Sequence, residues 1–212
     1  PGELLSILCD EPLVESFGGR IRVVAPLDVA LARSFHDEDP VGFASAHSAF
    51  AAIEDDRIEQ DIDQDELDSW QTRARLAYYL LRNLPAESES LFIDGFDSSP
   101  VADRRTCRIW LADLASRYTD VSGERTRVAD FFEAFRYYMA KDTDRAGDLF
   151  EEILRVRRDD KIAAVSLHLL ALCLDKKTSE SRRLQLLDES LNLSESLDLT
   201  ENQALTNALA VQ

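Results

Sequence analysis

Apolar residues in the second half of the chain recur every three or four positions, which is the period of one face of an α-helix. This spacing predicts helices over about residues 125–140, 144–158, 160–175, 180–196 and from 201 onward. Earlier runs with the same spacing predict helices over residues 67–81 and 101–118. All six prolines lie at or before Pro100, so helix breakers are concentrated in the first half of the chain. We therefore expect an all-α protein.

Residues 1–35 differ from the rest because short elements alternate there with breakers. An apolar helix over residues 3–9 is followed by a Gly18–Gly19 turn, a strand-like run near residues 20–25 and a new helix from Leu27. This order resembles the closing end of a winged-helix module, with a short β wing, as found before the repeats of STAND-type signalling NTPases. The alternative is an irregular N-terminal cap on the helical array.

A strong helix start follows, because Asp39 can cap the helix and Pro40 suits its first position. We expect this helix to end near Glu54. The next stretch, residues 54–68, is dominated by carboxylates and contains one arginine. It predicts a solvated loop whose end caps the following helix, and the alternative is a docking site for a basic partner. The stretch lacks the glycine that an EF-hand loop needs, so we expect no calcium site.

The chain contains an internal repeat. The segment from Asp144 lines up with the segment from Ser181, thirty-seven residues on, so that Phe150 matches Leu187. Similarly, the segment from Ala77 parallels the one from Phe135. Between them, we expect Pro85 to end one helix, a partner helix over residues 86–92 to follow, and residues 95–100 to form a turn. Self-similarity at such a period predicts an α-solenoid of stacked antiparallel helical hairpins, which is typically a binding scaffold.

The second half resembles tetratricopeptide (TPR) repeats, in which a small residue, an aromatic residue and an apolar residue pack the second helix of each hairpin. Ala146, Phe150 and Ile153 follow that order. The resemblance covers roughly residues 70–212 and is clearest from 124 to 212. We assign residues 1–35 to the module end or cap and residues 36–212 to the TPR-like repeats.

The first helix of this hairpin departs from the family, because counting back from Ala146 places Asp130 and Glu133 where TPR repeats carry large apolar residues. The apolar stripe indicates a different register, since burying two unpaired carboxylates would be costly. In that register the core residues are Val128, Phe131, Phe132 and Phe135. The residues that then face the groove, and that we predict to bind a partner, are Glu133, Arg136 and Tyr137. Burial of both aromatic faces of residues 131–139 by neighbouring helices is the alternative.

The formal charge of −17 comes from 41 acidic and 24 basic residues, and no basic cluster offsets it. Direct binding to nucleic acid is therefore disfavoured, because neutralising phosphates supplies most of the affinity for it. Neither a membrane-spanning run nor a signal peptide is evident, and three scattered cysteines suit neither a disulfide framework nor a zinc site. We expect a cytoplasmic protein, and the start at Pro1 suggests a piece of a longer chain.

Candidate chemistry is sparse. The three histidines are isolated, and His168 on an apolar helix is expected to be a hydrogen-bonded packing residue. No HExxH, GxSxG or glycine-rich phosphate loop occurs. Paired carboxylates such as Glu151–Glu152 are expected to face solvent. We therefore expect no catalytic residue, metal site or cofactor in this chain, and a catalytic domain can lie outside it.

These patterns favour a non-catalytic protein-interaction module, the sensor or scaffold part of a larger intracellular regulatory protein. Its partner would be a protein or peptide, with the net acidity favouring a basic one. One alternative is an autoinhibitory or oligomerising arm of a STAND-type NTPase, which would form homo-oligomers through the full-length protein. Another is a helical-bundle enzyme that uses carboxylate chemistry.

Overall fold

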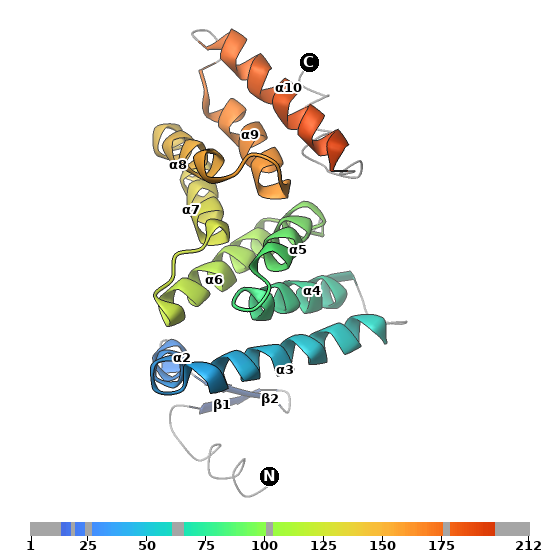
Figure 1. Ribbon diagram of the computed structural model, residues 1–212, viewed down its shortest axis with the longest axis vertical. Helices are drawn as coiled ribbons and strands as arrows, with labels where there is room; N and C mark the ends of the chain where they lie inside the picture. The colour runs from blue at the N-terminus through green and yellow to red at the C-terminus, as the bar shows by residue number, and fades with distance from the viewer. Residues whose placement is uncertain are drawn as a thin grey trace, which may run out of the picture.

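The computed structural model describes residues 14–17, 20–23, 27–60, 66–100, 104–175 and 179–197. In these residues the chain is overwhelmingly helical. The helices are α2 (Leu27–Glu38), α3 (Pro40–Glu59), α4 (Glu66–Leu80), α5 (Pro85–Asp97), α6 (Arg104–Ser122), α7 (Arg127–Met139), α8 (Thr143–Val156), α9 (Lys161–Cys173) and α10 (Glu180–Ser196). Figure 1 shows them arranged along the long axis of the molecule, from α2 and α3 at one end to α10 at the other.

A short hairpin precedes the helices. Strands β1 (Val14–Phe17) and β2 (Arg20–Val23) pair antiparallel, with Val14 opposite Val23. Two paired strands of four residues do not define a winged-helix module, because its preceding helix would fall in residues 1–13, outside the described residues. Both interpretations of the N-terminal region, the module end and the cap, therefore stay predictions.

The predicted end of the third helix is wrong. The helix starts as expected, since the Asp39 carboxylate accepts a hydrogen bond from the Gly42 amide at 2.8 Å, but it continues past Glu54 to Glu59. Glu54 is buried, at 6 % exposure, and accepts hydrogen bonds from Arg75 of α4 at 3.0 and 3.3 Å. Part of the carboxylate run is thus helical instead of forming a loop. The ion pair with Arg75 of α4 offsets the cost of burying the charge of Glu54. Residues 61–65 lie outside the described residues.

The predicted boundaries of α5 also need correction. Pro85 begins this helix instead of only ending the previous one, as its fixed φ suits the first helical position. The helix runs through Gly95 to Asp97, so part of the expected turn is helical. Gly95 is held in place because its carbonyl accepts hydrogen bonds from the Trp70 indole at 2.8 Å and from the Ser99 hydroxyl at 2.9 Å.

The predicted helices of the second half are confirmed for α7 to α10 to within three residues at each end. Helix α8 begins at residue 143 and α10 at residue 180, thirty-seven residues apart, as the repeat requires. Helix α5 begins at residue 85, fifty-eight before α8, which equals the offset between Ala77 and Phe135. Helix α6 has no counterpart in either alignment. The expected helix from residue 201 lies outside the described residues.

Aromatic side chains form the centre of the core. Phe92, Phe131, Phe132 and Phe150 are all buried, and the Phe96 ring meets the Phe135 ring edge-on at 4.9 Å between centroids. The register predicted for α7 is therefore confirmed, with its apolar stripe in the core. Each of these rings is packed by side chains from a neighbouring helix.

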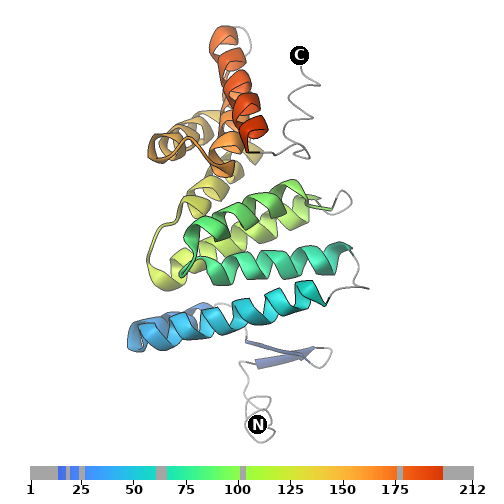
Figure 2. The same cartoon turned by 45° about the vertical axis from the view of Figure 1, so that its right-hand side comes forward.

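Consecutive helices pack against one another, and the helices at the two ends of the stack pack against different neighbours. Helix α3 packs against α2 and α4, whereas α10 packs against α9. Figure 2 shows α3 and α4 as successive layers beneath α5 and α6. Helix α9 is apolar on all sides and is buried from Ile162 to Ala171 between its neighbours. Among the described residues, no helix combines the length and apolar character that crossing a membrane requires.

Candidate functional site

Helices α6 and α7 form the two walls of an open groove. The turn between them is set by Gly123, whose φ of +71° is a left-handed conformation that glycine adopts without strain, and whose amide donates to the Thr119 carbonyl at 2.9 Å. The Thr126 hydroxyl then caps α7 by accepting from the Ala129 amide at 3.2 Å. The groove has a polar half near this turn and an apolar half at the opposite end.

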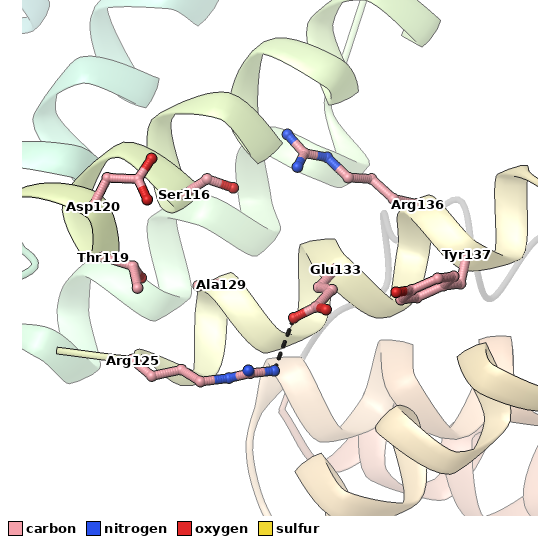
Figure 3. A pocket seen from close by; sticks show the side chains of 8 residues that line it. All are labelled: Ser116, Thr119, Asp120, Arg125, Ala129, Glu133, Arg136 and Tyr137. Atoms are coloured by element: carbon pink, nitrogen blue, oxygen red, sulfur yellow. Dashed lines mark hydrogen bonds and ion pairs between the residues drawn. The ribbon is translucent and has the colours of Figure 1, made fainter. Parts of the chain in front are cut away.

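The polar half is a cavity of about 360 Å³ between the end of α6 and the start of α7. Its lining side chains are Ser116, Thr119, Asp120, Arg125, Ala129, Glu133, Arg136 and Tyr137. Figure 3 shows Ser116 and Asp120 on α6 across the cavity from Glu133, Arg136 and Tyr137 on α7. The structure thus brings all three sequence-predicted residues to one cavity wall.

Ion pairs hold the side chains of the polar half. Arg125 bridges two carboxylates of α7: it lies 2.8 Å from Glu133, as drawn in Figure 3, and pairs with Asp130. The hydrogen bond that Arg125 donates to the Asp130 carboxylate raises the pKa of Arg125 above its ordinary value. Arg136 donates to Asp113 of α6 at 2.6 Å. These pairs leave the polar half with mixed charge.

Tyr137 offers the aromatic surface of the polar half. Its ring is partly buried, and the Arg145 guanidinium lies 5.6 Å from the ring centroid. This distance is within the range of a cation–π contact. A ring that is positioned in this way loses little conformational freedom when a ligand covers it.

The apolar half is a cavity of about 490 Å³ between the start of α6 and the end of α7. Its lining side chains are Arg104, Arg105, Arg108, Ile109, Ala112, Phe135, Arg136 and Met139. Ile109 and Met139 are 51 % and 48 % exposed, although both are large apolar residues. Arginines surround this apolar surface.

Arg108 is positioned by contacts with Phe96 of α5. Its guanidinium lies 3.9 Å from the Phe96 ring centroid, and its Nε donates to the Phe96 carbonyl at 3.1 Å. Burial lowers the pKa of Arg108 to about 10. Burial also raises the pKa of Asp97 to about 7, although Arg108 acts in the opposite direction. The aromatic contact and the hydrogen bond fix this guanidinium at the inner edge of the groove.

Behind Arg108 lies a smaller cavity of about 180 Å³, whose lining includes Asp97, Arg108, Phe135, Met139 and His168. His168 is buried as expected, but its Nδ1 has no hydrogen-bond partner among the described residues, so the prediction of a hydrogen-bonded histidine is not confirmed for that nitrogen. Burial lowers the pKa of this imidazole, which favours its neutral form.

Two further chemistries find little support in this part of the molecule. Burial raises the pKa of the Cys173 thiol to about 11, so the reactive thiolate is scarce at neutral pH. Within the described residues, no group of three His, Cys, Asp or Glu side chains is arranged to hold a metal ion.

Sequence reasoning missed the apolar half of the groove. The sequence pattern does not single out Arg104, Arg105 and Arg108 as a basic cluster, nor Ile109 and Met139 as exposed apolar residues. One signal could have found them: cationic residues in the first turn of a helix oppose the helix dipole, so Arg104 and Arg105 do not serve to stabilise α6.

Comparison with known proteins returned no relative. No family model matches the chain, and neither a curated protein nor a solved structure matches it.

Proposed function

We propose that this chain is a non-catalytic protein-interaction module that binds a segment of another protein in the α6–α7 groove. The observation that carries the proposal is the open cavity of about 360 Å³ that Glu133, Arg136 and Tyr137 line together from α7. Helix-walled grooves of this kind suit peptide or helix ligands, because side chains from both walls can contact one ligand.

The proposal includes a TPR-like arrangement of the helical hairpins. Burial of Ala146, Phe150 and Ile153 on one face of α8 supports it, because those are the packing positions in the family that the sequence resembles. The matching starts of α5, α8 and α10 support it too. Neither internal alignment contains α6 and α7 as a pair, so the proposal does not require these two helices to close as a regular hairpin.

The proposal places the module in a larger cytoplasmic regulatory protein, as its sensor or scaffold part. The net charge of −17 favours approach of a basic segment over long range. Exposed carboxylates at the α3–α4 connection contribute to this field, and they include Asp55, Asp56, Glu59 and Glu66. Such a field acts on the association rate more than on the final contacts.

The test uses a labelled peptide of about sixteen residues, with leucine at helical spacing and lysine at the remaining positions, and follows its binding kinetics. Tyr137→Ala is expected to speed dissociation by about tenfold, because an aromatic anchor contributes mainly to the lifetime of a complex. Neutralising Asp55, Asp56, Glu59 and Glu66 together is expected to slow association and leave dissociation unchanged. Arg73→Ala on α4 is the control, since Arg73 is exposed and does not line the groove.

Peptide binding that is insensitive to Tyr137→Ala would contradict the assignment of the polar half. Association that is independent of added salt would show that the acidity serves solvation only, because exposed charges are screened beyond about 10 Å at 0.1 M salt.

A further inference from the structure

We propose that the apolar half of the groove binds an acidic amphipathic segment of a partner protein, one in which leucine-, isoleucine- or phenylalanine-type side chains alternate with aspartate and glutamate. The inference rests on the proposed function, that the α6–α7 groove receives a protein segment. It assigns the chemistry of the part of that segment that enters between the start of α6 and the end of α7.

The floor of this half is apolar and open to solvent. Ile109 on α6 and Met139 on α7 line the same cavity, together with Ala112 and Phe135. Large exposed apolar side chains that share one concave surface are typical of a binding site and not of a solvated face. Methionine suits such a site because its flexible, polarisable side chain adapts to the ligand.

The rim of this half is cationic. Arg104, Arg105, Arg108 and Arg136 come from two helices and line one cavity. Arg105 is exposed and makes no hydrogen bond or ion pair with any residue in the described part of the chain. Arg108 is anchored by the Phe96 ring, so its guanidinium is presented without loss of rotamer freedom.

Arginine side chains gather here although the molecule carries a net negative charge. Among the described residues, Asp113 pairs with Arg136, and the charge of Asp97 interacts with Arg108. Arg105 has no such partner there, so its guanidinium is available to an acidic ligand. In a chain of net charge −17, four arginines around one apolar cavity give charge complementarity to an acidic ligand.

The geometry favours a protein segment over other occupants. The cavity lies along two antiparallel helices and is open, so a helix or extended strand can enter without a gate. Nucleic acid is disfavoured because the rest of the described surface carries excess negative charge and would repel phosphates. A second copy of this chain could supply acidic apolar segments of its own, and the experiment below separates that case.

The experiment compares two labelled peptides of about sixteen residues that share leucine at helical spacing and differ only in carrying glutamate or lysine elsewhere. Fluorescence anisotropy measures the binding of each peptide to the full chain, and light scattering records the oligomeric state. The glutamate peptide is expected to bind the chain, although the net charge of the chain alone would favour the lysine peptide. Arg105→Glu is expected to weaken its binding by about tenfold or more. Ile109→Asp should also weaken it.

Arg73→Glu is the matched control. Arg73 is likewise an exposed arginine but lies outside the groove, and its replacement by glutamate changes the net charge by the same amount. Circular dichroism of each variant shows whether the helices persist. Lysine-peptide binding that is lost in Tyr137→Ala, with no glutamate-peptide binding up to about 1 mM, would overturn the inference and leave the proposed function standing. Failure of both peptides would overturn both.

Equal weakening by Arg105→Glu and Arg73→Glu would also overturn the inference, because it would show a response to net charge alone. Concentration-dependent dimers that Arg105→Glu abolishes, without peptide binding, would assign the groove to a second copy of the chain instead of a separate partner.

Discussion

At the scale of single residues, the core depends on aromatic side chains whose neighbours leave no space for relaxation. Phe150 is 0 % exposed, and its ring centroid lies 6.1 Å from that of Phe131 on the preceding helix. Glu151, the next residue, is only partly buried and makes long ion pairs with Arg155 at 3.5 Å and Arg182 at 3.4 Å. Two adjacent positions on α8 thus differ sharply in what they contribute to stability.

Phe150→Ala is expected to lower the free energy of unfolding by about 3 to 5 kcal/mol, because the cavity it leaves cannot be filled. Glu151→Ala should change it by less than about 1 kcal/mol, as exposed ion pairs contribute little. Denaturant titration followed by circular dichroism measures both values. Similar small losses in the two variants would show that the α8 faces are misassigned.

His47 gives the molecule a pH dependence. It is 5 % exposed within an aromatic cluster, with its ring 4.3 Å from that of Phe43 between centroids, and its Nδ1 has no hydrogen-bond partner in the part of the chain that the structure describes. Burial lowers the pKa of His47 from 6.5 to about 4. A group with a lowered folded-state pKa stabilises the fold while it is neutral, above pH 6.5, and that contribution is lost as pH falls toward 4.

His47→Gln is therefore expected to reduce the loss of unfolding free energy between roughly pH 7 and pH 4.5. The comparison must be made between variants, because the raised pKa of Asp97 acts in the opposite direction over part of this range. Denaturant titrations at the two pH values measure the difference. An unchanged loss in the variant would mean that the histidine is not protected from protonation by the fold.

At the scale of elements, ion pairs connect helices that are distant in sequence. Arg127, at the start of α7, donates to the Asp160 carboxylate at 3.1 Å and to the Arg157 carbonyl at 3.1 Å, and it lies 3.5 Å from Glu89 of α5. Asp160 also caps α9, since its carboxylate accepts from the Ala163 amide at 2.9 Å. One arginine therefore joins three helices.

Arg127→Ala is expected to cost about 3 kcal/mol of unfolding free energy, because it leaves the carboxylates of Asp160 and Glu89 without their buried cation. Arg158→Ala is the control, since Arg158 pairs with Glu189 at an exposed position and should cost less than about 1 kcal/mol. Thermal and chemical unfolding measure both. Equal costs would indicate that solvent screens the Arg127 cluster as fully as the surface pair.

Element prediction succeeded where the local pattern and the final environment agree, as in α8 and α10, whose apolar spacing and start signals are clear. It failed at Glu54 and Gly95. The carboxylate run by itself predicts a solvated loop, because the sequence does not show that Arg75 pairs with Glu54. Gly95 by itself predicts a turn, because the sequence does not show that Trp70 and Ser99 donate hydrogen bonds to its carbonyl. Both contacts join residues that sequence order alone does not pair.

At the scale of the whole molecule, the helices form an elongated stack in which each end has its own neighbours (Figure 1). In the repeat array that we propose, stability would be approximately a sum over neighbouring units. Leu187 of α10 is 4 % exposed against α9, whereas Leu184 on the same helix is 49 % exposed. Damage at the α9–α10 interface is thus expected to stay local.

Leu187→Asp is expected to abolish the hydrogen-exchange protection of α10 and to weaken that of α9, because the charge cannot be buried there. Protection of α3 and α4 should persist, since neither packs against α10 in the stack. Leu184→Asp should leave every helix protected. Loss of protection throughout the molecule in Leu187→Asp would show a single cooperative unit in place of an array.

The sequence by itself determined the helical class, the repeat of α8 in α10 and the register of α7, because hydrophobic spacing acts through local geometry that every helix shares. It also selected Glu133, Arg136 and Tyr137 as one face. Only the tertiary structure decided that this face meets α6, and that arginines at the start of α6 join Ile109 and Met139 in one groove. The reason is physical: a groove is a relation between two helices, and their separation is set by packing that neither segment encodes alone.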